Sequence, residues 1–209
     1  MKITEVSPQK NNSMRVNVFV DGEYCFSLDA AEAALKGIKK DKEISQKQIT
    51  NLLMDSEYSK ARDYALNILS SKSISSADLI KKILQKGYAE IIANEVIAEL
   101  SDLGYVDDVA YANLFLEYCT EKMWGKKKIY YEMKQKGLSD EIIENTLSCF
   151  NDDDCLETMA QTIVSKYGRD DLTNIKTKNK IIRYFVSRGF DFSKADAAIR
   201  LASKEFSDE

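Results

Sequence analysis

Apolar positions in this chain repeat around three glycines. Each glycine has apolar residues eight and four positions before it, a basic residue just before it and a large apolar residue just after it. The three sets are Leu79, Ile83, Lys86-Gly87-Tyr88; Ile129, Met133, Lys136-Gly137-Leu138; and Ile181, Phe185, Arg188-Gly189-Phe190. Apolar residues four apart lie on one helix face, and a left-handed glycine commonly ends a helix. Any single instance is ordinary helix-end sequence, but three instances about 50 residues apart indicate a repeat.

Further amphipathic helices are expected on both sides of each glycine helix. A helix follows each glycine, and another precedes each pair over Tyr58–Leu69, Val109–Cys119 and Leu156–Tyr167. The predicted fold class is mainly α, with three tandem three-helix repeats that form an elongated curved body. A small N-terminal β-hairpin-plus-helix region precedes them. The expected limits are 1–55 for this region, 56–104 and 105–151 for repeats 1 and 2, and 152–209 for repeat 3 and a polar tail.

The N-terminal region carries the clear alternating pattern. Met14, Val16 and Val18 alternate with polar residues, and so do Tyr24, Phe26 and Leu28. We expect a three-residue loop with a bulge at Gly22, which pairs Val18 with Tyr24, Val16 with Phe26 and Met14 with Leu28. A two-residue Asp21-Gly22 loop would place the two apolar sets on opposite faces. A further short strand is expected over 2–6, broken by Ser7-Pro8.

Capping residues mark several helix starts. Asp29 with Glu32 predicts a capping box before a helix over 30–36 that Gly37 ends, and Ser45 with Gln48 predicts another. Ser75 and Asp107 are expected N-caps, and Gly104 is expected to end a helix. The pattern leaves open whether the helix after Ser45 continues without a break into Tyr58–Leu69. Asp152-Asp153-Asp154 suits a helix start better than a metal loop, because the spacing of a calcium loop is absent.

Composition excludes several classes of function. The net charge is −4, and histidine is absent from all 209 residues. The common general base and zinc ligand are therefore missing, and no constellation of catalytic residues is visible. We expect no enzyme activity, no metal and no cofactor. The four cysteines lack C-x-x-C spacing, which favours reduced thiols in a cytosolic protein. Without a signal peptide or membrane span, we expect a cytoplasmic monomer.

The acidic average, with a pI of about 5.2, conceals a local excess of cations. Cations concentrate in the helices before Gly137 and Gly189, at Lys126, Lys127, Lys128, Lys134, Lys136, Lys178, Lys180, Arg183 and Arg188. If the repeats stack, these two helices present corresponding faces and form a basic stripe that contacts phosphates or an acidic protein surface. A solvated helix surface is the alternative. Trp124 is expected to anchor two units together or to contact a partner.

These motifs resemble the RecX family of RecA regulators. The resemblance rests on Lys86-Gly87-Tyr88, Gly104-Tyr105-Val106-Asp107-Asp108 with Tyr111-Ala112, Gly125 with Ile129, Lys136-Gly137-Leu138 and Arg188-Gly189-Phe190. The repeat-defining residues are accordingly Gly87, Gly104, Tyr105, Asp107, Tyr111, Gly137 and Gly189. The N-terminal extension resembles the longer form of the family in Gram-positive bacteria.

The resemblance implies a function and a partner. RecX-like proteins bind in the groove of the RecA–DNA filament and limit its extension, ATP hydrolysis and strand exchange. It therefore implies the RecA filament as partner, with single-stranded or duplex DNA contacted mainly through the filament. The alternatives are a stand-alone DNA-binding helical module and a helical scaffold for another client.

Overall fold

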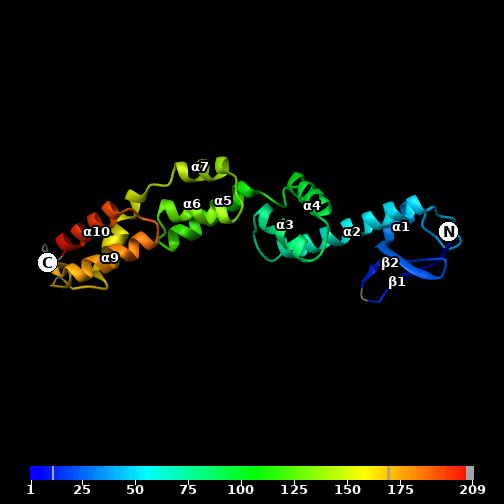
Figure 1. Cartoon of the computed structure of the whole chain (residues 1–209), viewed down its shortest axis with the longest axis horizontal. Helices are drawn as coiled ribbons and strands as arrows, with labels where there is room; N and C mark the ends of the chain where they lie inside the picture. Colours follow the sequence, from blue (N-terminus) through cyan, green and yellow to red (C-terminus); the bar gives the residue numbers. More distant parts are fainter. Residues whose placement is uncertain (11, 169, 206–209) are drawn as a thin grey trace. The chain divides into compact units, whose positions relative to one another are not determined.

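The structure is a computed structural model that describes residues 1–10, 12–168 and 170–205. It divides into two compact units, Met1–Val106 and Asp107–Glu209 (Figure 1). The first unit holds a three-stranded sheet and four helices, and the second holds six helices and two short 3-10 turns, within the described residues.

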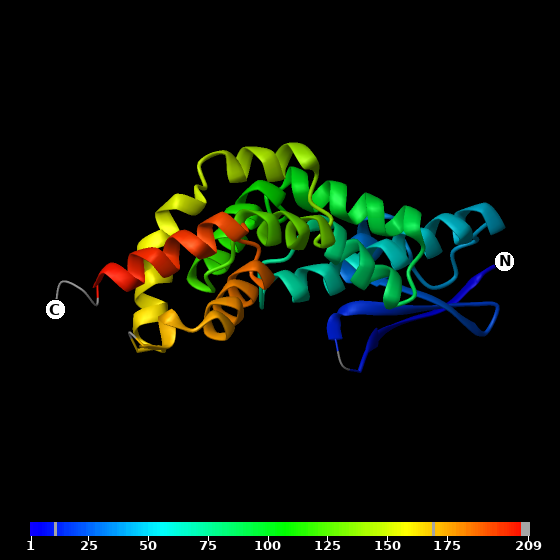
Figure 2. The ribbon, with the colours of Figure 1, turned by 60° about the vertical axis from the view of Figure 1, so that its left-hand side comes forward.

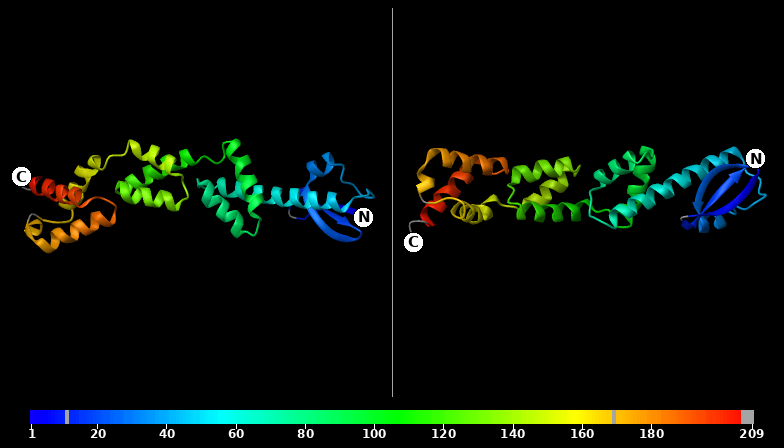
Figure 3. Two further views of the ribbon diagram at one scale, coloured as in Figure 1. Left: turned by 45° about the horizontal axis from the view of Figure 1, so that its top comes forward. Right: turned by 90° about the horizontal axis from the view of Figure 1, so that it is seen from below.

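The N-terminal sheet contains three antiparallel strands in the order β1-β2-β3 (Figure 3). Its strands are β1 (Ile3–Gln9), β2 (Asn12–Val20) and β3 (Glu23–Asp29). The expected break at Ser7-Pro8 is wrong, because β1 continues through both residues and Pro8 pairs with Val16. Proline is tolerated there because β1 is an edge strand, where a missing backbone N–H can face away from the sheet.

The β2–β3 hairpin differs from the expected register. A two-residue turn at Asp21 and Gly22, both with positive φ, replaces the expected three-residue loop. Val18 pairs with Phe26 rather than with Tyr24, and Val16 pairs with Leu28. A bulge in β3 between Tyr24 and Phe26 restores the common apolar face that a regular two-residue hairpin would have lost.

Helix α2 (Gln46–Leu69) connects the sheet to the first repeat. It runs without a break from the expected Ser45–Gln48 capping box, which answers the question that the sequence left open. The sheet is fixed to it by the buried Arg15 of β2, whose guanidinium donates to Ser59 Oγ at 3.1 Å. Short α1 (Ala30–Leu35) follows the Asp29 N-cap, and Gly37 has the expected positive φ.

The repeated positions have matching structural roles in both units. The glycine helices are α3 (Ser76–Gln85), α6 (Lys126–Gln135) and α9 (Ile175–Ser187). Their two apolar positions are at most 2 % exposed in all three: Leu79, Ile83, Ile129, Met133, Ile181 and Phe185. Gly87, Gly137 and Gly189 all have positive φ, so each glycine ends its helix in the same left-handed conformation.

Each glycine helix belongs to a three-helix group with its own apolar cluster. In the first unit, α3 packs with α2 and α4 (Glu90–Asp102). In the second unit, α6 packs with α5 (Asp108–Glu121) and α7 (Asp140–Ser148). The last cluster joins α8 (Leu156–Val164), α9 and α10 (Phe192–Glu205), with short turns η1 (Asp152–Cys155) and η2 (Asp170–Thr173) (Figure 2). The chain is thus mainly helical, with tandem three-helix groups that follow a small sheet along the sequence; the curved body and exact repeat limits stay predictions.

Candidate cationic interaction surface

The basic residues of interest lie on α6 and α9 in the second unit. Gly125 is the N-cap residue of α6, and it has no side chain that could accept a hydrogen bond from the first turn. Asp152, at the start of η1, supplies the missing acceptor: its Oδ1 receives the Lys126 backbone N–H at 2.9 Å. The three aspartates were expected to cap the helix that they begin. Instead, Asn151 caps η1, and Asp152 caps α6 of the preceding repeat.

Gly125 also meets the end of α9 backbone to backbone. Its N–H donates to the Arg188 carbonyl at 2.8 Å, and a Cβ on Gly125 would lie 2.6 Å from the Gly189 carbonyl carbon. A Cβ on Gly189 would lie 2.5 Å from the backbone N of Lys128. Real Cβ atoms do not approach so closely, so both positions require glycine and repeats 2 and 3 are locked together here.

Charged side chains surround this glycine contact. Lys127 of α6 forms an ion pair with Asp191, and Lys194 of α10 forms one with Asp153. The hydrogen bond that Lys127 donates to Asp191 raises the pKa of Lys127. The Arg188 guanidinium donates to the Lys122 carbonyl. Lys127 and Arg188, both proposed as partner contacts from the sequence, thus have internal partners at the repeat 2–repeat 3 junction.

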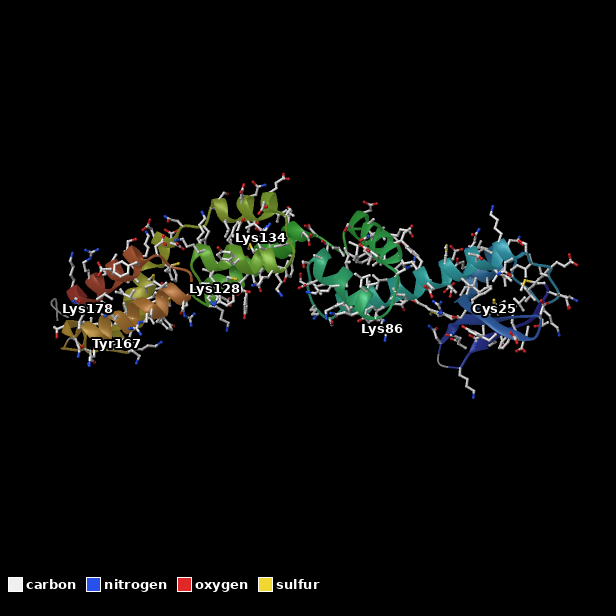
Figure 4. The ribbon with its side chains drawn as sticks, viewed as in Figure 1. Cys25, Lys86, Lys128, Lys134, Tyr167 and Lys178 are labelled. Atoms are coloured by element: carbon white, nitrogen blue, oxygen red, sulfur yellow. The ribbon has the colours of Figure 1, made fainter. Side chains whose placement is uncertain are left out.

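Two more lysines of α6 are engaged within repeat 2. Lys134 Nζ lies 3.0 Å from Asp140 Oδ1, and that hydrogen bond raises the pKa of Lys134. Lys128 Nζ lies 4.3 Å from the centroid of the Trp124 ring, a cation–π contact. Figure 4 shows the two lysines on different sides of α6, with Lys134 toward α7. They do not share one line of contact along the helix.

Three cations of the predicted set are less engaged. Lys126 on α6 and Lys180 and Arg183 on α9 are exposed, and within the described part of the chain their side chains have no ion pair or hydrogen bond. Lys178 and Lys136 are half-buried. Lys126, Lys128 and Lys136 precede Gly137 by the same numbers of residues as Lys178, Lys180 and Arg188 precede Gly189. The two basic helices therefore carry cations at three pairs of equivalent sequence positions, and the common basic stripe stays a prediction.

An aromatic series accompanies these cations. The rings of Tyr111, Phe115 and Tyr118 stack along α5 at centroid distances of 6.1 Å, and Tyr118 meets Trp124 edge to face. Lys122 Nζ lies 5.6 Å from the Tyr118 ring. This series was not predicted from the sequence, although its members are spaced three and four residues apart, which is the spacing of neighbours on one helix face.

The same combination recurs in repeat 3. Lys166 Nζ and the Arg188 guanidinium lie 5.2 Å and 4.7 Å from the centroid of the Tyr184 ring. Trp124 packs within the repeat 2 cluster rather than between units, and it is Met123 that packs on the repeat 3 cluster. The surface of the second unit therefore combines exposed cations with aromatic rings, a composition suited to anionic partners.

The other repeat-defining residues lie at helix ends. Asp107 caps α5 by accepting the Val109 and Ala110 N–H groups, and Gly104 ends α4 with positive φ. Tyr105 is exposed and Tyr111 packs against the repeat 2 cluster. All four cysteines are free thiols, and burial raises the pKa of Cys119 to about 12. Over the described residues, no three acidic or cysteine side chains gather as metal ligands would.

Comparison with protein families matches three successive parts of the chain. The Regulatory protein RecX N-terminal domain matches residues 1–45, the first RecX three-helix domain matches 61–100, and the second matches 107–147. The chain is 30% identical to the regulatory protein RecX of Bacillus licheniformis over 99% of this chain and 79% of the relative. The chain belongs to the RecX family. Membership supports a role as a regulator of RecA in general.

Other family members agree over the full length. The RecX protein of Caldanaerobacter subterraneus subsp. tengcongensis is 29% identical over 96% of this chain and all of the relative. A crystal structure of a regulatory protein RecX superimposes with a TM-score of 0.71 at 22% identity, covering 100% of this chain and 99% of that one, which shows the shared fold. The crystal structure of RecX from Lactobacillus salivarius superimposes with a TM-score of 0.61 at 25% identity. The match covers 70% of this chain and 96% of that chain. No helix in the described residues has the length and apolar character to cross a membrane.

Proposed function

We propose that this protein binds the RecA–DNA filament in its groove and limits filament extension, ATP hydrolysis and strand exchange. It acts in the cytoplasm as a monomer and reaches DNA mainly through the filament. The observation that carries the proposal is family membership over nearly the whole chain. The mechanism is steric and electrostatic, so it asks for no catalytic residue.

The free cations of the second unit are the proposed contacts. Lys126, Lys180 and Arg183 are exposed and, among the described residues, have no carboxylate partner, so binding them to a phosphate or an acidic surface breaks no internal ion pair. Lys127 and Lys134 would first have to leave Asp191 and Asp140. The first group therefore gains more from an anionic partner than the second.

The test is RecA-catalysed ATP hydrolysis on single-stranded DNA, titrated with this protein. The wild-type chain is expected to inhibit hydrolysis, and the triple variant Lys126→Glu, Lys180→Glu, Arg183→Glu to require at least about tenfold more protein for the same inhibition. Inhibition by the variant should also depend less on salt, because fewer counterions are released per molecule bound.

A matched control separates local contact from net charge. Lys39, Lys40 and Lys47 are exposed in the first unit, and changing all three to Glu alters the net charge by the same amount. This control should inhibit like wild type. Absence of any inhibition by the wild-type chain would refute the proposed function, and equal potency of the two triple variants would remove the cationic surface from the mechanism.

A stand-alone DNA-binding module is a second candidate, favoured by the aromatic series Tyr111, Phe115, Tyr118 and Trp124 beside Lys122 and Lys128. Stacking on aromatic rings is a common way to hold single strands. A gel shift with single-stranded and duplex DNA in the absence of RecA discriminates the two. Tight binding without RecA would favour the module, and weak binding that RecA strengthens favours the regulator.

A further inference from the structure

A small pocket lies between the end of α8 and the middle of α9. Its floor is formed by Ile163, Ile181 and Phe185, which are 1–2 % exposed. The pocket has a volume of about 90 Å³, and Thr162 and Tyr167 also line it. Tyr167 follows α8, and Figure 4 places it beside α9. Nothing in the proposed electrostatic mechanism uses this apolar floor.

The rim of the pocket is cationic and aromatic. Lys166 and Lys180 stand beside Tyr184, and the eight described residues that line the pocket include no acidic residue. Lys166 and Arg188 both lie against the Tyr184 ring, which is itself part of the pocket lining. An apolar floor inside a positive rim complements an apolar group that carries negative charges on both sides.

We propose that this pocket binds one aliphatic side chain of an acidic peptide segment on a partner protein. The aliphatic group fills the space above Phe185, and carboxylates that flank it pair with Lys166 and Lys180. The inference rests on the proposed function only where it assigns the acidic peptide segment to RecA, the partner that this protein is proposed to regulate. Binding of such a segment by itself requires no RecA and can be measured separately.

The size and the ring contacts favour a peptide over a nucleobase. An apolar cavity of about 150 Å³ is known to hold benzene, so 90 Å³ suits one aliphatic side chain better than a purine or pyrimidine ring. Lys166 and Arg188 already lie on the Tyr184 ring, and a base stacking there would have to displace one of them. Nucleic acid is therefore an outcome for the test to detect.

The test uses a fluorescent seven-residue peptide with one central leucine between three acidic residues on each side. Anisotropy titration with the full chain is expected to give saturable binding. Replacing the leucine of the probe by serine should weaken binding about ten- to hundredfold, the change expected for one buried leucine. Replacing the acidic residues by lysine should abolish binding. No saturable binding of the leucine probe would overturn the proposal.

Two variants of the protein locate the bound probe. Thr162→Trp places a large ring in the lining of the pocket and is expected to weaken probe binding at least about tenfold. Thr158→Trp makes the same change one turn earlier on α8, outside this pocket, and should bind like wild type. Circular dichroism checks that both variants are folded.

The inference would be overturned if both protein variants bound the probe equally, or if the leucine and serine probes bound equally. It would also be overturned if a single-stranded oligonucleotide bound more tightly than the leucine probe and Thr162→Trp removed that binding. Each can be read whether or not the protein inhibits RecA, so failure of the pocket and failure of the proposed function remain distinct.

Discussion

Helices α6 and α9 hold equivalent places in successive repeats and carry similar numbers of cations, but they use them differently. On α6, Lys127 pairs with Asp191, Lys134 with Asp140, and Lys128 lies on the Trp124 ring. On α9, Lys180 and Arg183 remain exposed without an acidic partner among the described residues. A high local density of lysine therefore does not by itself mark a binding surface.

The difference arises from where the acidic partners lie. The N-terminus of α6 contacts the next repeat. There, Asp152 accepts a hydrogen bond from the first backbone N–H of α6, and Asp191 accepts one from the Lys127 ammonium group. The exposed face of α9 has no such neighbour among the described residues. The backbone contact between Gly125 and Gly189 places α6 and α9 together, and substitutions there test this contrast most strongly.

The largest effect is expected for Gly189→Ala. Gly189 has a φ of +93°, and a Cβ there would lie 2.5 Å from Lys128. The substitution should lower the free energy of unfolding by about 2 to 5 kcal/mol, combining left-handed strain with a steric clash. Urea denaturation followed by Trp124 fluorescence measures it, because the single tryptophan directly precedes Gly125, whose backbone meets Gly189.

Gly87→Ala is the matched control. Gly87 has a similar φ of +101° at the equivalent position, but a Cβ there would meet no atom within 4 Å. It should cost only the left-handed strain, about 1 to 2 kcal/mol by circular dichroism. Equal losses at the two glycines would contradict the proposed locking of repeats 2 and 3.

A smaller effect is expected for Asp152→Ala. The change removes the carboxylate that accepts the first N–H of α6, and it should lower stability by about 1 kcal/mol. Asp154→Ala, two residues later on the same exposed turn, serves as the control and should be neutral. A loss at Asp154 as large as that at Asp152 would show that general charge, rather than capping across repeats, stabilises the junction.

The smallest effect concerns the pH dependence of the Lys134–Asp140 pair. Hydrogen bonds from Lys134 and Tyr130 lower the pKa of Asp140 below its ordinary value. The pair therefore stabilises the fold at pH values above the ordinary carboxyl pKa, and this contribution is lost as the pH falls through the lowered pKa. NMR titration should show the Asp140 pKa rising in Lys134→Ala; an unchanged pKa would mean that the pair does not form in solution.

Much of the fold could be predicted from the sequence. The spacing of Leu79, Ile83 and Gly87, repeated twice more, identified the glycine helices because a buried helix face and a left-handed C-cap impose strict local spacing. Ser45 and Asp107 marked helix starts for the same local reason. The hairpin register was wrong because a one-residue bulge in β3 cannot be read from an alternating pattern.

The partners of the cations could not be predicted in the same way. Asp191 lies 64 residues after Lys127, and Asp152 lies 26 residues after Lys126. Such pairings depend on how successive repeats pack, which local spacing does not determine. The sequence therefore located the basic helices but did not separate paired cations from free ones.

The most direct test of this separation compares two triple variants in the RecA ATPase titration. One reverses the free cations Lys126, Lys180 and Arg183 to Glu, and the other changes the engaged lysines Lys127, Lys128 and Lys134 to Glu, with inhibition normalised to the folded fraction of each. The free-cation variant is expected to lose at least about tenfold in potency and the engaged-lysine variant less than about threefold. The reverse order would contradict the account.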